Sequence, residues 1–233
     1  MASGVMVVAT ALDTFLYQFP LFRPLPRSRL EELGEYAFLR RYQRGQILFM
    51  EGDPRDRIYF LTSGYIRLVS TDENCATQLF LYEKPYSIFP CVGLFKDEYY
   101  RFSGETVTDV ELIFFPTDVF ERLVQDAPPI LIHLIRFMGD KLYEREVRCQ
   151  RLAQAHAADR VRHLIGILIQ DLGEPVDAST IRIPCPLTTS DLARMAGTSR
   201  ETVSRLIQEY RAAGKLMMKS KTITVTDPAF FSV

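Results

Sequence analysis

The sequence predicts an α+β fold in three successive parts: an N-terminal antiparallel β-roll, one long helix, and a small helical domain that ends in a β-hairpin. Three observations support this fold class. Short β-rich runs alternate with turn residues between residues 42 and 116, a repeat of about 3.5 residues begins after Pro129, and two helix starts lie on either side of Gly197. With 233 residues, 47% of them hydrophobic and 24% charged, the chain is long enough for one large or two medium globular domains.

The β-roll is predicted from glycine turns that separate runs of β-branched and aromatic residues. Gly45, Gly52, Gly64, Gly93 and Gly104 lie between these runs. The predicted strands cover residues 58–61, 65–69, 78–82, 105–110 and 111–115. Short strands at this spacing favour an antiparallel roll over a sheet of β-α-β units. Upstream, residues 27–39 predict a short amphipathic helix that caps the roll.

The long helix is predicted from a hydrophobic seam with alternating steps of four and three residues. The seam positions are Leu131, Ile135, Met138, Leu142, Arg145, Cys149 and Leu152. An amphipathic helix of this length needs an apolar partner for its stripe, either the β-roll of the same chain or a second copy of the helix. A strict heptad pattern is typical of a narrow helix–helix seam, so the sequence favours a homodimer.

The C-terminal part is predicted to be a small domain joined to the long helix by a hinge. Residues 153–158 keep helical propensity but lose the bulky seam residues, which indicates a joint. A second helix is predicted over residues 159–172 and ends at Gly173. Residues 215–226 predict a terminal hairpin that turns near residues 219–220.

Residues 189–207 have the pattern of a helix-turn-helix. Thr189 or Ser190 is predicted to cap the first helix, and Thr198 or Ser199 the second. Ala193 is small where two helices must touch, and Gly197 supplies the turn. This spacing places the contact between the two helices and the turn that joins them where the motif requires them.

The second of these helices carries side chains suited to reading DNA. Its first turns expose Arg200, Glu201, Ser204 and Arg205. Arginine donates two hydrogen bonds to guanine, and glutamate accepts from cytosine N4. Residues 188–221 include seven basic and only three acidic residues. This local excess of positive charge is suited to binding the phosphates of DNA. A structural alternative is that residues 198 and 201 form a capping box and that Arg205 pairs with Glu201.

The net charge, the positions of the cysteines and the motifs present exclude several classes of protein. Lys and Arg total 28 against 29 Asp and Glu, so a net charge of -1 gives no global attraction to nucleic acid or membrane. The four cysteines lie far apart, without a CxxC pair. No nucleophile–base set, P-loop or metal-ligand spacing is present. We therefore expect a cytoplasmic protein with reduced thiols, no membrane span, no signal peptide, no metal, no cofactor and no enzymatic activity.

The order of these parts resembles the cyclic-AMP receptor and fumarate-nitrate regulator (CRP/FNR) family of bacterial transcription factors. The likeness covers roughly residues 15–230, and its most specific segments are 51–64, 92–95 and 198–205. It implies an effector-sensing, cyclic-nucleotide-binding-like β-roll domain over residues 1–128, a dimerisation helix over 129–154 and a winged helix-turn-helix DNA-binding domain over 155–233. In this family an effector shifts the seam helix and so moves the two recognition helices.

The resemblance also implies how DNA is read. Arg200, Glu201 and Arg205 match the cyclic-AMP receptor pattern, while Glu201, Ser204 and Arg205 match the fumarate-nitrate pattern. Both predict a palindrome whose half-sites share a TGA core. Thr188, Ser199 and Thr202 are expected at phosphates, which set position more than sequence. The expected partners are double-stranded DNA, a second copy of the chain and RNA polymerase.

The effector loop departs from that of the cyclic-nucleotide binders. Arg101 lies where their phosphate-binding arginine is expected, but Phe89 and Pro90 replace the Gly-Glu that holds the ribose, and proline also removes an N–H donor. The candidate effector residues are Arg101, Phe89, Pro90, Gly93 and Leu94. Cyclic AMP is therefore not expected as the effector.

The sequence is compatible with several kinds of signal for the β-roll domain. The loop and the aromatic residues after it resemble the arginine-deiminase regulators of the family. No cysteine precedes Cys75, which excludes the terminal iron–sulfur sensor of the fumarate-nitrate branch. A different small ligand, activity without ligand, and a thiol switch at Cys149 are the alternatives. The rival class of protein is a ligand-sensing module whose C-terminal domain binds protein rather than DNA.

Overall fold

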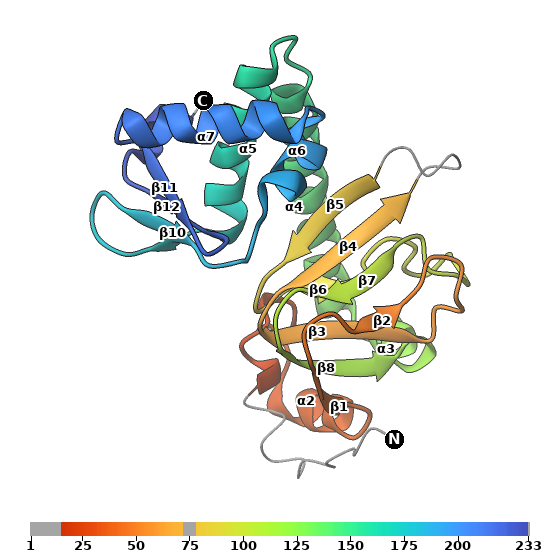
Figure 1. Ribbon diagram of the computed structural model, residues 1–233. Helices are drawn as coiled ribbons and strands as arrows, with labels where there is room; N and C mark the ends of the chain where they lie inside the picture. The colour runs from red at the N-terminus through yellow and green to blue at the C-terminus, as the bar shows by residue number, and fades with distance from the viewer. Residues whose placement is uncertain (1–14, 72–77, 233) are drawn as a thin grey trace. The chain divides into compact units, whose positions relative to one another are not determined.

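A computed structural model describes residues 15–71 and 78–232 (Figure 1). The chain divides into two compact units. Unit 1 comprises the residues before 71 together with 81–142, and unit 2 comprises residues 71–80 together with those from 143 onward. The division lies inside the long helix, so this helix contributes to both units.

Unit 1 is the predicted antiparallel β-roll. Its strands are β1 (Phe38–Tyr42), β2 (Ile47–Phe49), β3 (Arg57–Ser63), β4 (Ile66–Thr71), β5 (Gln78–Glu83), β6 (Ile88–Phe89), β7 (Ser103–Thr106) and β8 (Val110–Pro116). They form two four-stranded sheets with the orders β1-β8-β3-β6 and β2-β7-β4-β5. The fold class predicted from the alternation of short strands and glycine turns is therefore confirmed.

Two boundaries in unit 1 differ from the sequence prediction. The helix predicted over residues 27–39 ends early, because α2 covers only Arg27–Gly34 and residue 38 already begins β1. Strand β1 pairs with β8 along its whole length, and Phe38 stacks on Phe114 at 5.2 Å between ring centroids. This pairing with a distant strand overrides the local helical pattern. The strand predicted over 105–110 is also split, since β7 ends at Thr106 and Val110 belongs to β8.

Helices and aromatic rings close one side of the roll. The 3-10 helix η1 (Pro20–Phe22), α2, α3 (Thr117–Gln125) and the first turns of α4 (Pro128–Leu152) contribute to one hydrophobic cluster. Phe22 stacks on Phe60 at 5.1 Å, and Phe60 makes an edge contact with Phe115 at 5.2 Å. Ring pairs of this kind add about 0.5–1.5 kcal/mol each to the hydrophobic gain, so this cluster fixes where α4 begins.

Unit 2 is a helical domain with a four-stranded sheet. Its elements are α5 (Ala157–Leu172), β9 (Glu174–Pro175), β10 (Ile181–Ile183), α6 (Thr189–Ala196), α7 (Arg200–Ala212), β11 (Leu216–Lys219), β12 (Thr222–Val225) and α8 (Pro228–Phe231). The sheet order is β11-β12-β10-β9. The predicted hairpin is present, with Lys219 opposite Thr222 and positive φ at Ser220 and Lys221 in its turn.

The short helix α8 packs against α5 through a glycine. A side chain on Gly166 would place its Cβ 2.3 Å from the carbonyl oxygen of Phe231. Phe231 is fully buried and makes an edge contact with Tyr210 of α7 at 5.4 Å. The C-terminal segment therefore packs against α5 and α7, and α7 is one of the two helices that carry the candidate site. None of the helices in the described part of the chain is both long and apolar enough to cross a membrane.

Candidate functional site

Helices α6 and α7 form the predicted helix-turn-helix. Thr188 caps α6: its hydroxyl accepts from the Asp191 N–H at 3.1 Å, and the Asp191 carboxylate accepts from the Thr188 N–H at 2.8 Å. The cap is thus one residue earlier than predicted, and the capping box lies here rather than at residues 198 and 201. Gly197 ends α6 in the left-handed region with φ 59°, as the turn requires.

The first turns of α7 present polar side chains outward. Ser199 caps the helix by accepting from the Thr202 N–H at 3.1 Å, while Val203, Leu206 and Ile207 are buried. Arg200, Glu201 and Arg205 are exposed, and Ser204 is half-buried. A helix with one buried face and a polar N-terminal face has the form that enters a major groove.

Charge at this helix start suits hydrogen bonding to bases. Hydrogen bonds from its own backbone N–H and from the Ser199 hydroxyl hold the pKa of Glu201 below its ordinary value. Glu201 is therefore ionised at neutral pH and accepts hydrogen bonds only. Arg205 pairs with Glu209 at 2.5 Å, one turn later, rather than with Glu201 as the structural alternative supposed.

The three residues expected at phosphates have different surroundings. The Ser199 and Thr202 hydroxyls lie 3.1 Å apart at the start of α7. The Thr188 hydroxyl donates to Asp191 at 2.6 Å, so it would have to leave this carboxylate in order to donate to a phosphate. Among the neighbouring basic residues, Lys215 pairs with Asp227 at 2.7 Å, whereas Lys219 and Lys221 are exposed at the hairpin turn.

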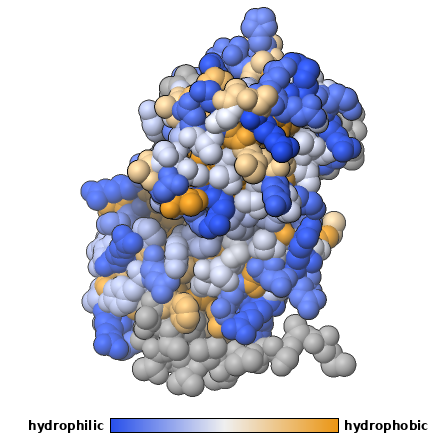
Figure 2. Space-filling model, turned by 60° about the vertical axis from the view of Figure 1, so that its left-hand side comes forward, coloured by the Kyte–Doolittle hydropathy of each residue, from blue (hydrophilic) through white to orange (hydrophobic). Residues whose placement is uncertain are grey.

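The predicted seam of α4 divides into two sets. Leu131 and Met138 are partly buried against the core of unit 1. Ile135 and Leu142 are 59% and 60% exposed, and Cys149 is also exposed. Ile132 and Tyr143 of the same helix are exposed as well. The face drawn in Figure 2 shows hydrophobic residues in small groups among hydrophilic ones.

The remaining seam positions are polar or lie near the end of the helix. Arg145 and Leu152 are half-buried. Beside them, desolvation holds the pKa of Arg148 below its ordinary value, while Asp171 of α5 lies 3.8 Å from its guanidinium. Within residues 15–71 and 78–232, no group of three His, Cys, Asp or Glu side chains is placed to hold a metal ion.

The candidate effector loop folds into the roll instead of lining an open site. Phe89 is fully buried and stacks on Tyr59 at 5.4 Å, and Pro90 is buried beside it. Gly93 has φ 85°, and a Cβ there would lie 2.5 Å from the Asp97 carboxylate. Leu94 is half-buried. Phe89 therefore belongs to one hydrophobic core cluster, Leu94 packs against another, and Pro90 is buried.

Arg101, the candidate phosphate ligand, already holds a carboxylate of the same chain. Its guanidinium donates from Nε and Nη2 to the two oxygens of Asp97, at 2.5 and 3.0 Å. This bidentate pair, with the hydrogen bond as its main cause, lowers the pKa of Asp97 and raises that of Arg101. An anionic ligand would have to compete with Asp97 for these two donors or bind the remaining N–H groups of Arg101.

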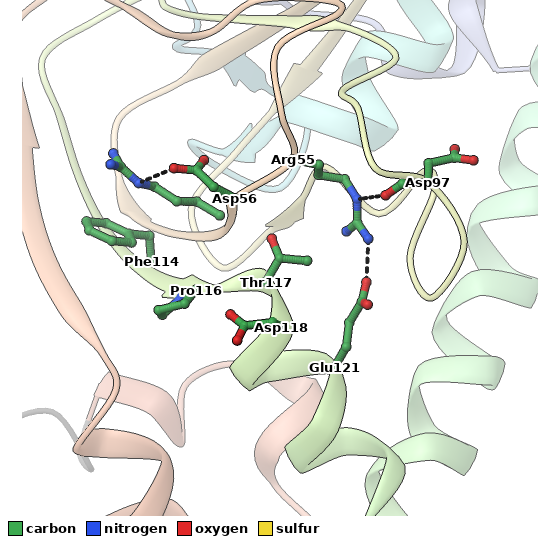
Figure 3. A pocket seen from close by; sticks show the side chains of 9 residues that line it. Arg55, Asp56, Asp97, Phe114, Pro116, Thr117, Asp118 and Glu121 are labelled. Atoms are coloured by element: carbon green, nitrogen blue, oxygen red, sulfur yellow. Dashed lines mark hydrogen bonds and ion pairs between the residues drawn. The ribbon is translucent and has the colours of Figure 1, made fainter.

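A buried arginine beside this loop was not identified from the sequence. The Arg55 side chain is 3% exposed, donates to the Asp97 carbonyl at 2.9 Å and forms an ion pair with Glu121 of α3 (Figure 3). Glu121 also accepts from the Phe95 N–H at 2.8 Å. These residues border a pocket of about 560 Å³. Arg55 thus ties the turn after the effector loop to α3, the helix that precedes α4.

Two protein-family models match the two units. The model of the cyclic nucleotide-binding domain matches residues 39–127, and the model of the Crp-like helix-turn-helix domain matches residues 159–230. Together they span both the effector loop and the helix-turn-helix described above.

Relatives with known roles match nearly the whole chain. The HTH-type transcriptional regulator ArcR of Staphylococcus epidermidis is 28% identical over 215 residues, which are 92% of this chain and 93% of the relative. The global nitrogen regulator of Synechocystis sp. is 26% identical over 195 residues, 82% of this chain and 85% of the relative. The solved structure of FixK2 from Bradyrhizobium japonicum has a TM-score of 0.71 and 18% identity, covering 84% of this chain and 95% of that chain, which shows the shared fold.

Proposed function

Because the chain belongs to the CRP/FNR family of transcription regulators and carries its DNA-binding helix-turn-helix, we propose that it acts as a homodimer that binds a palindrome with TGA-containing half-sites. The observation that carries the proposal is the outward face at the start of α7, where Arg200, Glu201 and Arg205 are exposed over a buried apolar face. Arginine at guanine and ionised glutamate at cytosine specify bases, while Ser199 and Thr202 supply hydroxyls for phosphates.

The exposed side chains of α4 support the dimer. Ile135, Leu142 and Cys149 follow the heptad spacing and lack a covering element in unit 1 or unit 2 as each is described. A second copy of α4 would cover them with the same residues, since a two-fold axis makes an interface self-complementary. Two recognition helices held in this way would reach successive major grooves about one helical turn apart.

The effector is proposed to be a molecule other than cyclic AMP, or the protein acts without one. Pro90 removes a backbone N–H donor from the loop. The Asp97 carboxylate accepts hydrogen bonds from Nε and Nη2 of Arg101. RNA polymerase is the proposed protein partner, because a regulator of this class acts on transcription.

Arg205→Ala is expected to weaken binding to the preferred palindrome by about 1–3 kcal/mol per half-site and to relax the preference at the contacted guanine. The Arg205–Glu209 pair lies on the surface and is worth no more than about 1 kcal/mol, so Arg205 can leave Glu209 for a base at small cost. Fluorescence anisotropy with duplexes that vary at one position measures both effects.

The matched control for this measurement is Arg211→Ala at the other end of α7. It removes the same charge from the same helix but should leave base preference unchanged. An equal loss of affinity on every duplex for Arg205→Ala would contradict base reading by this residue.

Cyclic AMP is expected to leave the thermal unfolding midpoint of the protein unchanged. An ordinary binder gains about 2.7 kcal/mol when the ligand is at 100 times its Kd, which raises the midpoint by several degrees. Differential scanning fluorimetry over a nucleotide series measures this. A clear rise that Arg101→Ala abolishes would overturn our interpretation of the effector loop.

A further inference from the structure

One arginine of α5 contacts both the hinge after α4 and the turn between α6 and α7. Arg160 is half-buried and donates four hydrogen bonds, all to backbone carbonyls. Its Nε and Nη2 reach Ala196 and Gly197 at 2.8 and 3.0 Å, in the turn between α6 and α7. Its Nη1 reaches Gln154 and Ala155 at 2.9 and 3.0 Å, in the hinge after α4.

Two of these carbonyls, those of Ala196 and Gly197, lie at the C-terminal end of α6, and the other two lie in the hinge between α4 and α5. The last carbonyls of a helix have no partner within the helix, and they carry the negative end of its dipole. The Ala193 and Arg194 carbonyls are taken by the C-cap N–H groups of α6, which leaves those of Ala196 and Gly197 to Arg160. A single cation therefore satisfies carbonyls at the C-terminal end of α6 and in the hinge after α4.

Only an arginine has the geometry for this contact. Its planar guanidinium offers five N–H donors in fixed directions, so it can span two chain segments at once. A lysine ammonium is a single point donor at the end of a flexible stem and would reach one segment but not hold both in a fixed relation.

We propose that Arg160 is a positioning residue for DNA recognition: it fixes the hinge after α4 to the turn from which α7 starts. Gly197 lies three residues before Arg200, the first residue of α7, so a fixed Gly197 carbonyl sets where the recognition helix begins. A movement of the hinge would then be passed to α7 without passing through the interior of the domain. This inference rests on the DNA-binding role of α7.

Loss of Arg160 should leave the domain folded. The last turn of α4 keeps its own contact with α5, because His163 Nδ1 lies 3.0 Å from the Arg151 carbonyl. Val161, Leu164, Leu168 and Val203 remain in the buried core of the domain. Arg160→Met keeps much of the side-chain length while it removes every donor.

The test compares full-length wild type, Arg160→Met and Arg160→Lys, with Arg122→Met as the control that removes an exposed arginine from α3. Each is titrated with the duplex selected by wild type and with a scrambled duplex, at several salt concentrations, and its unfolding midpoint is recorded. We expect Arg160→Met to lose about 10- to 100-fold in affinity for the selected duplex. Binding to the scrambled duplex and the salt slope should stay unchanged, and Arg160→Lys should be intermediate.

Three results would overturn the proposal. A salt slope reduced by about two, one for each copy in the dimer, would make Arg160 a phosphate contact. Equal losses on both duplexes would make it a support of the fold alone. Unchanged affinities for both duplexes in a folded variant would show that Arg160 does not contribute to recognition. If Arg160→Met does not fold, the same ratios for Arg160→Lys decide. A wild type that prefers no duplex would instead contradict the proposed palindrome recognition.

Discussion

Leu142→Asp is expected to convert the proposed dimer into monomers and to abolish high-affinity binding to a palindrome. Leu142 is 60% exposed in a single chain and lies at a central seam position of α4. In a dimer, two new carboxylates would be buried against apolar side chains and each other without a partner. A penalty of at least about 3 kcal/mol raises the dimer Kd roughly a hundredfold or more. Sedimentation equilibrium and anisotropy on a palindromic duplex measure the two losses.

Gln150→Asp is the matched control for the seam. It places the same carboxylate on an exposed position of α4 that is outside the predicted seam. We expect it to remain dimeric and to bind DNA as wild type does. If Leu142→Asp keeps the sedimentation mass of the wild type, the exposed stripe does not form the dimer interface.

Arg55→Met is expected to destabilise the β-roll by about 3–5 kcal/mol, because it leaves the Glu121 carboxylate without its buried partner. The turn at residues 95–97 should loosen as well, since Arg55 donates to the Asp97 carbonyl. The protein has two units, so a single midpoint does not isolate this effect. Hydrogen exchange of peptides from β3 and α3 in increasing urea measures the stability of the roll itself.

Two further variants separate charge from packing. Arg122→Met removes an arginine that is 66% exposed and pairs with Asp118 on the surface, and it should cost less than about 1 kcal/mol. Arg55→Met combined with Glu121→Leu removes both buried charges and should recover much of the stability lost in the single variant. A single variant as stable as Arg122→Met would show that the buried pair does not stabilise the roll.

The parts of the fold with strong local signals could be predicted from the sequence. The strands around residues 58–61 and 111–115, the helix α5 and the hairpin around residues 219–220 have clear periodicity or turn residues. The helix-turn-helix was found because a small residue, a glycine and two helix caps occur at fixed spacing. The family resemblance adds the functional role of these elements.

Other elements could not be predicted, because they are too short for a periodic pattern or depend on pairing with distant segments of the chain. Strands β9 and β6 have two residues each, which is too short for a periodic signal. Strand β1 exists because β8 pairs with it, and its segment by itself favours a helix. The Thr188 cap was missed by one residue because Thr188, Thr189 and Ser190 have equivalent capping side chains.

The contacts of Arg55 and Arg160 could not be predicted for a similar reason. Arg55 meets Glu121 across 66 positions of sequence, and Arg160 meets Gly197 across 37. Neither belongs to a motif, and both look like ordinary charged residues until the fold brings their acceptors close. The Asp97 partner of Arg101 is the exception, because it lies only four residues away in the sequence.

Selection of bound fragments from a pool of random duplexes tests the central claim most directly. We predict a two-fold palindrome with a TGA core in each half-site and about one helical turn between half-site centres. We also expect hydroxyl-radical footprinting of the selected duplex to show two protected regions related by the same symmetry. A single asymmetric site, or a pool in which no sequence is enriched, would contradict a dimer that reads DNA with paired α7 helices.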